Sequence, residues 1–251
     1  MTVEVIRSSL LEGIPHGFLG RRAGVSTGVV AGLNVGTGSG DDPDAIARNI
    51  ALATSAVLPG AALARVYQIH SATAVVAEPW PMDQRPQADA LVTDRPGLLL
   101  GIVTADCVPV LLADRDAGVI GAAHAGWRGA LGGVTDSTID LMESMGADRR
   151  RITAAVGPCI AQASYEVDAA FKDRFLADDP LNECFFRDAP TPHFDLEAYV
   201  VGRLAAAGIG SVEALSLDTY ADSDRFFSYR RATHQGEADY GRQFSLIGLA
   251  P

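Results

Sequence analysis

Long apolar segments are absent from the 251-residue sequence. No uninterrupted run approaches the roughly 20 apolar residues that a membrane-spanning helix needs. The first residues, MTVEVIRSSLLEG, also lack the apolar segment of a secretory signal. We therefore expect a cytoplasmic protein that has no membrane as a partner.

Basic side chains are in the minority. The chain has 20 lysines and arginines against 31 aspartates and glutamates, which gives a formal net charge of −11. General binding to nucleic acid depends on lysines and arginines that neutralise phosphates. We therefore expect no nucleic-acid partner, although a few arginines gathered in a cleft could still hold a small anionic substrate.

Cysteines and known phosphate-binding motifs are also few. Three cysteines, an odd number and widely spaced, make a poor disulfide framework, so we expect reduced thiols. The glycine-rich segment 20–36 is followed by no G-K-S/T and has no G-x-G-x-x-G pattern. It is therefore neither a Walker loop nor a dinucleotide-binding fingerprint.

The apolar patterns predict a single α/β domain over residues 1–251, with a mixed β-sheet core and flanking helices. Near-continuous apolar runs, typical of strands covered on both faces, predict strands at 65–70, 74–78, 90–93, 98–104, 108–114, 118–124, 152–156 and 212–217. Helical spacing predicts helices at 44–57, 130–145 and 196–208. The turn DRDAG predicts a hairpin between 108–114 and 118–124.

Three metal-capable side chains stand at or near the ends of predicted strands. They are His70 in QIHS, Cys107 in TADC and His124 in HAGWRG. Two imidazoles and one thiolate suit zinc, and three protein ligands leave a fourth position open for water or substrate. Such a site lowers the pKa of bound water to about 7 or polarises an oxygen as a Lewis acid. We treat the three residues as a candidate catalytic zinc site.

The residues alone leave two other interpretations open. Cys107 could be a nucleophile activated by His124 or His70, as in thiol hydrolases, or all three side chains could serve packing only. If a metal is bound, Asp106, Ser71 and Thr104 are close enough in sequence to orient a ligand. Each could equally cap a turn, which is the interpretation we favour for Thr104.

The segment HAGWRG also offers groups for a flat, anionic substrate. Trp127 could stack on a ring, and Arg128 could hold an anion. The predicted helix 130–145 begins just after this segment, so its N-terminal amides could add to an anion site.

Taken in order, the motifs resemble those of one known family. They are RAGVS, LNVG, DDP, QIHS, DALVT, TADCVPVLLAD, HAGWRG, GPCI, YEV and FFSYRR. Together they resemble the laccase-domain proteins once called multicopper polyphenol oxidoreductases, from about residue 16 to residue 249. The family is also described as zinc-dependent purine nucleoside phosphorylases with adenosine deaminase activity. Some bacterial members are described as peptidoglycan editing factors.

The resemblance implies the fold shared with a bacterial deamidase toxin and a zinc site made by His70, Cys107 and His124. It implies phosphorolysis of adenosine, inosine, guanosine and methylthioadenosine to the free base and ribose 1-phosphate. It further implies hydrolytic deamination of adenosine to inosine. The expected partners are therefore a small-molecule nucleoside and phosphate; the oligomeric state is left open, with a monomer as one possibility.

Several positions that match the family are candidates for contact with the substrate or phosphate: Arg22, Asn34, Gln68 and Arg128. Asp106 is the candidate catalytic group for proton transfer, the part that a carboxylate plays in zinc deaminases.

Three residues depart from the family pattern. Ala23 stands where a glycine is usual, Ile50 where many relatives have an arginine, and Asp218 where a cysteine is frequent. The missing arginine at position 50 removes one potential anion contact.

The older copper-oxidase description can be tested by counting histidines. A blue-copper site takes two histidines and a cysteine, and a laccase needs several more histidines for a trinuclear cluster. With five histidines in all, a complete multicopper relay is not expected, although copper could replace zinc in the one site. The alternatives to a phosphorylase are therefore a hydrolase that edits misincorporated amino acids in peptidoglycan precursors, a copper-dependent polyphenol oxidase, or a metal-stabilised binding module.

Overall fold

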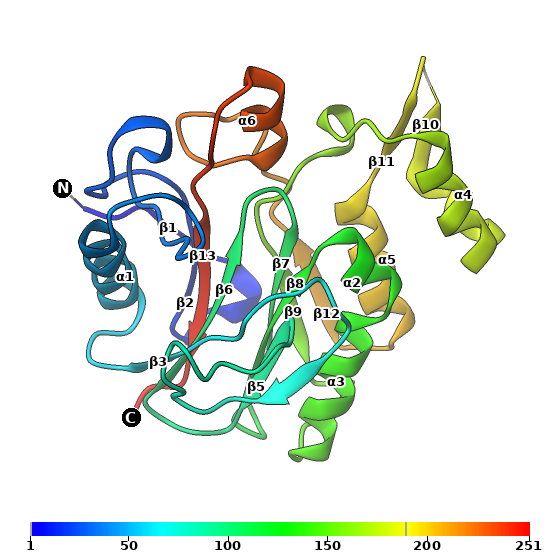
Figure 1. The fold of residues 1–251 in the computed structure, drawn as a ribbon. Coiled ribbons are helices and arrows are strands. Elements are labelled where there is room, and N and C mark those ends of the chain that lie inside the picture. The colour runs from blue at the N-terminus through cyan, green and yellow to red at the C-terminus, as the bar shows by residue number, and fades with distance from the viewer. Residues whose placement is uncertain (1, 189) are drawn as a thin grey trace.

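The computed structural model describes residues 2–188 and 190–251. Two mixed sheets pack face to face, and helices cover both outer faces (Figure 1). The five-stranded sheet has the order β1-β2-β13-β6-β3. In that order its strands are Val5–Ile6, His16–Leu19, Gln243–Gly248, Leu98–Thr104 and Ala62–Ala64.

The second sheet has six strands in the order β12-β9-β7-β8-β5-β4. In that order they are Ser211–Ala214, Thr153–Val156, Val108–Asp114, Val119–Ala125, Ala90–Thr93 and Ala74–Val76. A separate two-stranded ribbon pairs β10, Phe186–Asp188, with β11, Pro192–Phe194.

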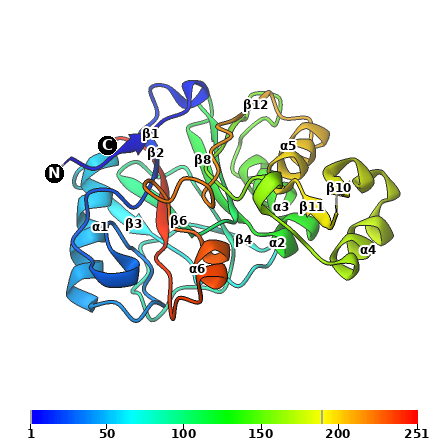
Figure 2. The ribbon, with the colours of Figure 1, turned by 90° about the horizontal axis from the view of Figure 1, so that it is seen from above.

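Helices α1, α3 and α5 cover the outer faces of the sheets. Figure 2 shows α1 on one side of the sheets and α3 and α5 on the other. The bounds are α1 Pro43–Val57, α2 Trp127–Leu131, α3 Val134–Ser144, α4 Ala169–Asp178, α5 Leu196–Ala206 and α6 Tyr229–Gln235. No helix in the described part of the chain is both long enough and apolar enough to cross a membrane.

The core follows from the apolar runs. Strands β7 and β8 are buried along their whole length, because one face packs against the five-stranded sheet and the other against helices α3 and α5. They form the predicted antiparallel hairpin. The α/β architecture with a mixed sheet and flanking helices is confirmed, except that the strands divide into two sheets rather than one.

The turn of this hairpin depends on a buried carboxylate. Asp114 accepts hydrogen bonds from the backbone N–H groups of Asp116 and Ala117, as expected for a turn that begins with aspartate. It also accepts from the backbone of Asp148 and the guanidinium of Arg151, which joins the hairpin to the segment before β9.

The prediction of a strand at 65–70 is wrong. The strand β3 ends at Ala64, and the next residues follow an irregular path in which His70 has a φ of 61°. The backbone N–H groups of Ile69, His70 and Ser71 bond to the carboxylate of Asp89 instead of to a neighbouring strand. A side chain therefore takes the hydrogen bonds that a sheet would need.

The predicted helix 130–145 is also wrong in its extent. Helix α2 begins at Trp127, and a break at Gly132 and Gly133 separates it from α3. Gly133 has a φ of 89°, a left-handed conformation that favours glycine. The segment HAGWRG therefore ends inside a short helix rather than in a loop before a longer one.

The backbone at Ala23 adopts a left-handed conformation that favours glycine. Ala23 has a φ of 61°, and L-residues lose roughly 1–2 kcal/mol in this left-handed region. We expect Ala23→Gly to raise the free energy of unfolding by about 0.5–1 kcal/mol, after allowance for the greater freedom of glycine in the unfolded chain. Urea unfolding would measure the change.

Gly28 provides the reverse control. It has a φ of 66°, and a Cβ placed there would touch nothing within 4 Å. Gly28→Ala should therefore lower the stability through backbone conformation alone. An Ala23→Gly variant no more stable than the parent would contradict the strain at position 23.

Candidate active site

The three predicted metal ligands come together in the structure. The hairpin pairs Pro109 with His124, so the start of β7 and the end of β8 lie at the same edge of the sheet. Cys107 directly precedes β7, and His70 reaches this edge from the irregular segment after β3. One ligand atom from each of His70, Cys107 and His124 lies within 4.8 Å of the other two. We call this group the metal trio.

Asp89 fixes the orientation of the trio. Its fully buried carboxylate accepts a hydrogen bond of 2.8 Å from Nδ1 of His124 and one of 3.0 Å from the backbone N–H of His70. The Ser71 backbone and hydroxyl bond to its other oxygen. Because Nδ1–H of His124 donates to Asp89, the proton of the neutral ring lies on Nδ1, and the lone pair of Nε2 can then bind a metal in place of a second proton.

The electrostatics favour the thiolate that a metal requires. Burial alone would raise the pKa of the Cys107 thiol, but His124 and His70 outweigh it and lower this pKa to about 6. Burial would likewise lower the pKa of His124, but Cys107 and Asp89 raise it to about 9. The pKa of Asp89 falls to about 2, because hydrogen bonds from His124 and Ser71 outweigh its burial.

The donor set suits a zinc-like ion, and one pair of ligand atoms already has the expected spacing. Zinc bonds of about 2.0–2.3 Å in a tetrahedron place ligand atoms roughly 3.3–3.8 Å apart. Cys107 Sγ already lies 3.8 Å from His70 Nε2. Gly126 keeps the space clear, because a Cβ there would lie 2.7 Å from His70 Cδ2 and 3.0 Å from Cys107 Sγ. His70 is exposed and Cys107 half-buried, so a substrate can approach the trio from one side.

Two cavities meet at the trio. One, of about 370 Å³, is lined by all three trio residues and by Arg65, Arg85 and Arg242. We call it the arginine cavity.

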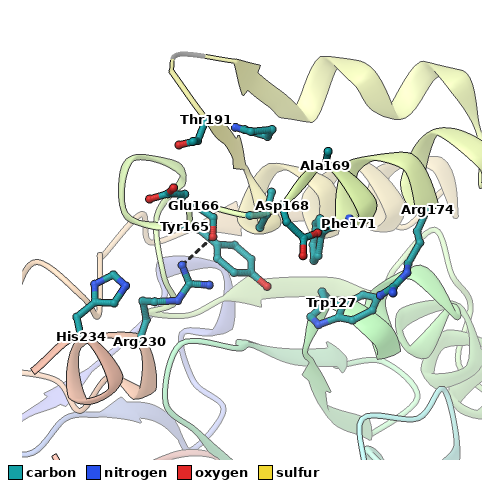
Figure 3. A pocket seen from close by; sticks show the side chains of 12 residues that line it. Trp127, Tyr165, Glu166, Asp168, Ala169, Phe171, Arg174, Thr191, Arg230 and His234 are labelled. Atoms are coloured by element: carbon teal, nitrogen blue, oxygen red, sulfur yellow. Dashed lines mark hydrogen bonds between the residues drawn. The ribbon is translucent and has the colours of Figure 1, made fainter. Parts of the chain in front are cut away.

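The other cavity, of about 340 Å³, is lined by His70 and Cys107 together with Asp106 and three aromatic residues, Trp127, Tyr165 and Tyr229. We call it the aromatic cavity. It continues into an open groove of about 750 Å³ that shares Trp127 and Tyr165 with it (Figure 3). In this groove Arg230 donates to the backbone oxygen of Glu166 and lies over the ring of Tyr165.

Asp106 lies in the aromatic cavity in a strained conformation, with a φ of 89°. Its carboxylate accepts hydrogen bonds from the hydroxyl of Thr219 and the backbone N–H of Arg230. Burial raises its pKa despite these donors. A carboxylate that is held in place and partly desolvated can exchange a proton with a substrate.

Two of the predicted substrate contacts line the cavities. Gln68 lines the arginine cavity, where its amide makes two hydrogen bonds with the backbone of Val103. Arg128 lines the aromatic cavity, with its guanidinium 5.1 Å from the ring centre of Trp127. The indole of Trp127 in turn packs on Phe171, so only part of it faces the cavity.

The other two predicted contacts lie elsewhere. Asn34 is fully buried, and its Oδ1 accepts from the backbone N–H groups of Gly36 and Arg242, two residues that line the arginine cavity. Asn34 can therefore influence the cavity only indirectly, by positioning Gly36 and Arg242. Arg22 lines neither cavity. Its side chain is exposed at the surface, where it pairs with Glu4.

Sequence reasoning missed Asp89 and the three cavity arginines. Asp89 stands directly before β5 in the motif DALVT, as Cys107 stands directly before β7, so a search for polar residues that precede strands as well as follow them could have found it. Arg65, Arg85 and Arg242 share no motif, and only the folded chain brings them together.

The sequence and the fold are similar to those of known proteins. Residues 15–250 match the family described as multi-copper polyphenol oxidoreductase laccase. A purine nucleoside phosphorylase of Deinococcus radiodurans is 42% identical over 241 residues, which cover 94% of this chain and 89% of that protein. A purine nucleoside phosphorylase of Streptomyces coelicolor is 38% identical over 227 residues, covering 88% of this chain and 91% of that protein.

Solved structures share the fold along the whole chain. A protein of Neisseria meningitidis matches with a TM-score of 0.88 and 33% identity, covering 100% of both chains. YlmD of Geobacillus stearothermophilus matches with a TM-score of 0.88 and 28% identity, covering 100% of this chain and 97% of that one.

The fold and the site define an α/β protein with an open His–Cys–His group able to hold a metal. The chain belongs to the multi-copper polyphenol oxidoreductase laccase family, as its motifs indicated. Its full-length relatives bear the name of an enzyme, which supports an enzymatic role. Among the described residues, the metal trio is the one cluster of histidine, cysteine and carboxylate ligands spaced to hold an ion.

The role of Asp89 can be tested by Asp89→Asn. The amide cannot accept all the hydrogen bonds of the carboxylate and presents its own N–H₂ to a donor, which weakens the orientation of His124. Loss of such a partner typically costs 10–100-fold in metal affinity. We expect the zinc dissociation constant to rise by about that factor, measured by competition with a chromophoric chelator.

Asp114→Asn is the matched control. Asp114 is also a buried carboxylate with several N–H donors, but it lies in the hairpin turn. This variant should lose about 1.5–3 kcal/mol of stability, the usual value of hydrogen bonds to a charged group, and keep the parent's zinc affinity. Equal zinc affinity in Asp89→Asn and the parent would refute the role given to Asp89.

Proposed function

We propose that the protein is a zinc-dependent purine nucleoside phosphorylase that acts on adenosine, inosine, guanosine and methylthioadenosine, and that it also deaminates adenosine. The observation that carries the proposal is an open metal trio reached from two cavities of different chemistry, one cationic and one aromatic. Relatives named as purine nucleoside phosphorylases support the same reaction.

His70, Cys107 and His124 would hold the ion. Bound there, zinc supplies a Lewis acid that polarises an oxygen or lowers the pKa of water. Asp89 keeps the His124 ring in position, and Gly126 leaves room for the thiolate and the His70 ring. The protein's contribution is thus a preformed donor set with one open side.

Phosphorolysis requires two substrates on opposite sides of one carbon. An oxygen of phosphate forms a bond to C1′ of the ribose, and the bond from C1′ to the purine nitrogen breaks. The electron pair of that bond leaves with the base, which takes up a proton; the products are ribose 1-phosphate and the free purine. Trp127 and Tyr165 offer aromatic faces for the purine, and Arg128 offers a cation for its polar edge.

Deamination uses the same base site without phosphate. Water adds to C6 of adenine, and ammonia leaves after it has gained a proton, so that adenosine becomes inosine. Asp106 is our candidate for carrying the proton between water and the leaving amine, because this residue lines the aromatic cavity and its carboxylate is held by Thr219 and Arg230.

The decisive variant is His124→Ala. It removes one metal ligand, and Lewis-acid assistance is worth several kcal/mol, so both phosphorolysis and deamination should fall by more than about a hundredfold. Chromatography of adenosine incubated with and without phosphate separates adenine from inosine and follows the two reactions together. Chelation of the parent protein should abolish both reactions, and added zinc should restore them.

The control His193→Ala removes a histidine from β11, outside the metal trio. It should keep the parent's activity and zinc content. Full activity in folded His124→Ala would refute the metal mechanism. Activity that survives chelation and is lost on alkylation of Cys107 would favour the thiol hydrolase instead.

Assays of the same protein preparation with other substrates distinguish the proposed function from its alternatives. Turnover of a UDP-muramoyl amino acid with no turnover of adenosine would favour an editing hydrolase of peptidoglycan precursors. Oxygen uptake with a polyphenol, dependent on copper, would favour the oxidase. Bound zinc without turnover of any of these substrates would favour a binding module.

A further inference from the structure

Three buried polar atoms lack a hydrogen-bond partner, and all three belong to residues that line the arginine cavity. Across residues 2–188 and 190–251, the buried side-chain nitrogens and oxygens without a partner are one terminal nitrogen each of Arg65 and Arg242 and the hydroxyl of Thr104. A buried polar group without a hydrogen-bond partner destabilises the fold. Three of them in one cavity indicate a ligand that accepts hydrogen bonds there.

Arg65 is held rigidly. Only 5% of its surface is exposed, and its guanidinium lies 4.9 Å from the ring centre of Phe244 in β13. Burial, followed by the nearby charge of Arg85, lowers the pKa of Arg65 to about 10, so it is still a cation at neutral pH. A buried cation of this kind is normally paired with an anion.

Arg242 and Arg85 complete the cationic wall. The guanidinium of Arg242 lies 4.1 Å from the ring centre of Tyr240. Gly36 makes room for it, because a Cβ there would lie 3.0 Å from both Cδ and a terminal nitrogen of Arg242. Arg85 bonds to the backbone oxygen of Met82 through Nε, which leaves its terminal nitrogens available.

The described residues do not supply an anion for this wall. No ion pair within the described residues involves Arg65, Arg85 or Arg242, although acidic side chains outnumber basic ones by 11 in the sequence. Three arginines that line one cavity with no carboxylate among its lining residues suit a doubly charged tetrahedral anion, because each guanidinium fork can donate to two of its oxygens.

We propose that the arginine cavity is a phosphate subsite, in which Arg65, Arg85 and Arg242 bind a phosphate group and the hydroxyl of Thr104 donates to it beside the metal trio. This inference rests on the proposed function and identifies where its second substrate binds. It also sets the orientation of the reaction, with phosphate on the arginine side of the trio and the purine on the aromatic side.

Two sources share this chemistry. The group can be free inorganic phosphate, as phosphorolysis requires, or the phosphate of a larger substrate such as a uridine diphosphate derivative. The cavity of about 370 Å³ exceeds a single phosphate ion, so the test must include both.

Calorimetric titration of the zinc-loaded protein with inorganic phosphate, without a nucleoside, tests the subsite directly. We expect Arg65→Met and Arg242→Met to weaken phosphate binding at least tenfold each, since a hydrogen bond to a charged group contributes about 1.5–3 kcal/mol. In phosphorolysis the same variants should raise the KM for phosphate more than the KM for the nucleoside. Arg187→Met, which replaces an exposed arginine in β10, is the control and should bind phosphate like the parent.

Thr104→Val keeps the test valid if an arginine variant fails to fold. Valine has nearly the same shape as threonine, so this variant removes only the unpartnered hydroxyl. In phosphate-free buffer its thermal midpoint should equal or exceed that of the parent, while the rise in midpoint caused by phosphate should shrink. A parent-like rise would contradict the contact between Thr104 and phosphate.

The outcomes separate the subsite from the proposed function. Phosphate binding that depends on Arg65 and Arg242, with no turnover of nucleosides, supports the subsite and refutes the phosphorylase. Binding of uridine diphosphate but not of inorganic phosphate, with the same dependence, supports the subsite and assigns it to a larger substrate. Parent-like binding in both arginine variants, or no binding of either ligand to the parent, overturns the subsite.

Discussion

The candidate active site depends on one buried carboxylate. Asp89 directly precedes β5. Its carboxylate accepts hydrogen bonds from three successive residues, Ile69 to Ser71, and from the ring of His124. These hydrogen bonds hold the irregular segment 69–71 beside strand β8, which carries His124. Because two of the three metal-trio residues are positioned by this group, the trio is assembled by an internal hydrogen-bond network before any ion arrives.

The remaining trio residue is positioned by the sheet. Cys107 precedes β7, and the antiparallel register between β7 and β8 brings it to the same end as His124. Both strands are buried on two faces, which makes them poor candidates for movement. The site therefore combines a rigid side, the hairpin, with an irregular side, the segment around His70, where φ is strained and the ring is exposed. Strain of this kind persists only where the surrounding structure holds it.

The long buried elements could be predicted from the sequence because their apolar pattern is set by burial on two faces. Strands β6, β7 and β8 and helices α1 and α5 fall close to their predicted bounds. Elements with shorter or mixed patterns were missed, among them β2, β13 and α6. Strand β13 lies between β2 and β6 in the sheet, although about 140 residues separate it from β6 in the sequence. A local sequence pattern cannot predict a pairing between such distant segments.

The candidate site likewise has one part that could be predicted from the sequence and one part that could not. The metal trio could be proposed because each member follows or ends a predicted strand, and the structure brings all three together, although the segment before His70 is irregular and not a strand. The arginine cavity could not, because Arg65 follows a short strand, Arg85 lies in a loop and Arg242 precedes β13. Their common property is not a motif but the absence of an acidic partner, and this property exists only in the folded chain.

The division into two cavities offers a physical reason why one centre could serve two reactions. In the proposed function, phosphorolysis and deamination share the purine and the metal but differ in the attacking group, which is phosphate in one case and water in the other. A base held against Trp127 and Tyr165 would present different atoms to the trio as its position shifts. Occupancy of the arginine cavity by phosphate would then select attack at the ribose carbon, because the anion fills the side from which that carbon is reached. The choice of reaction would thus be made by a ligand beside the metal rather than by a change in the metal's own ligands.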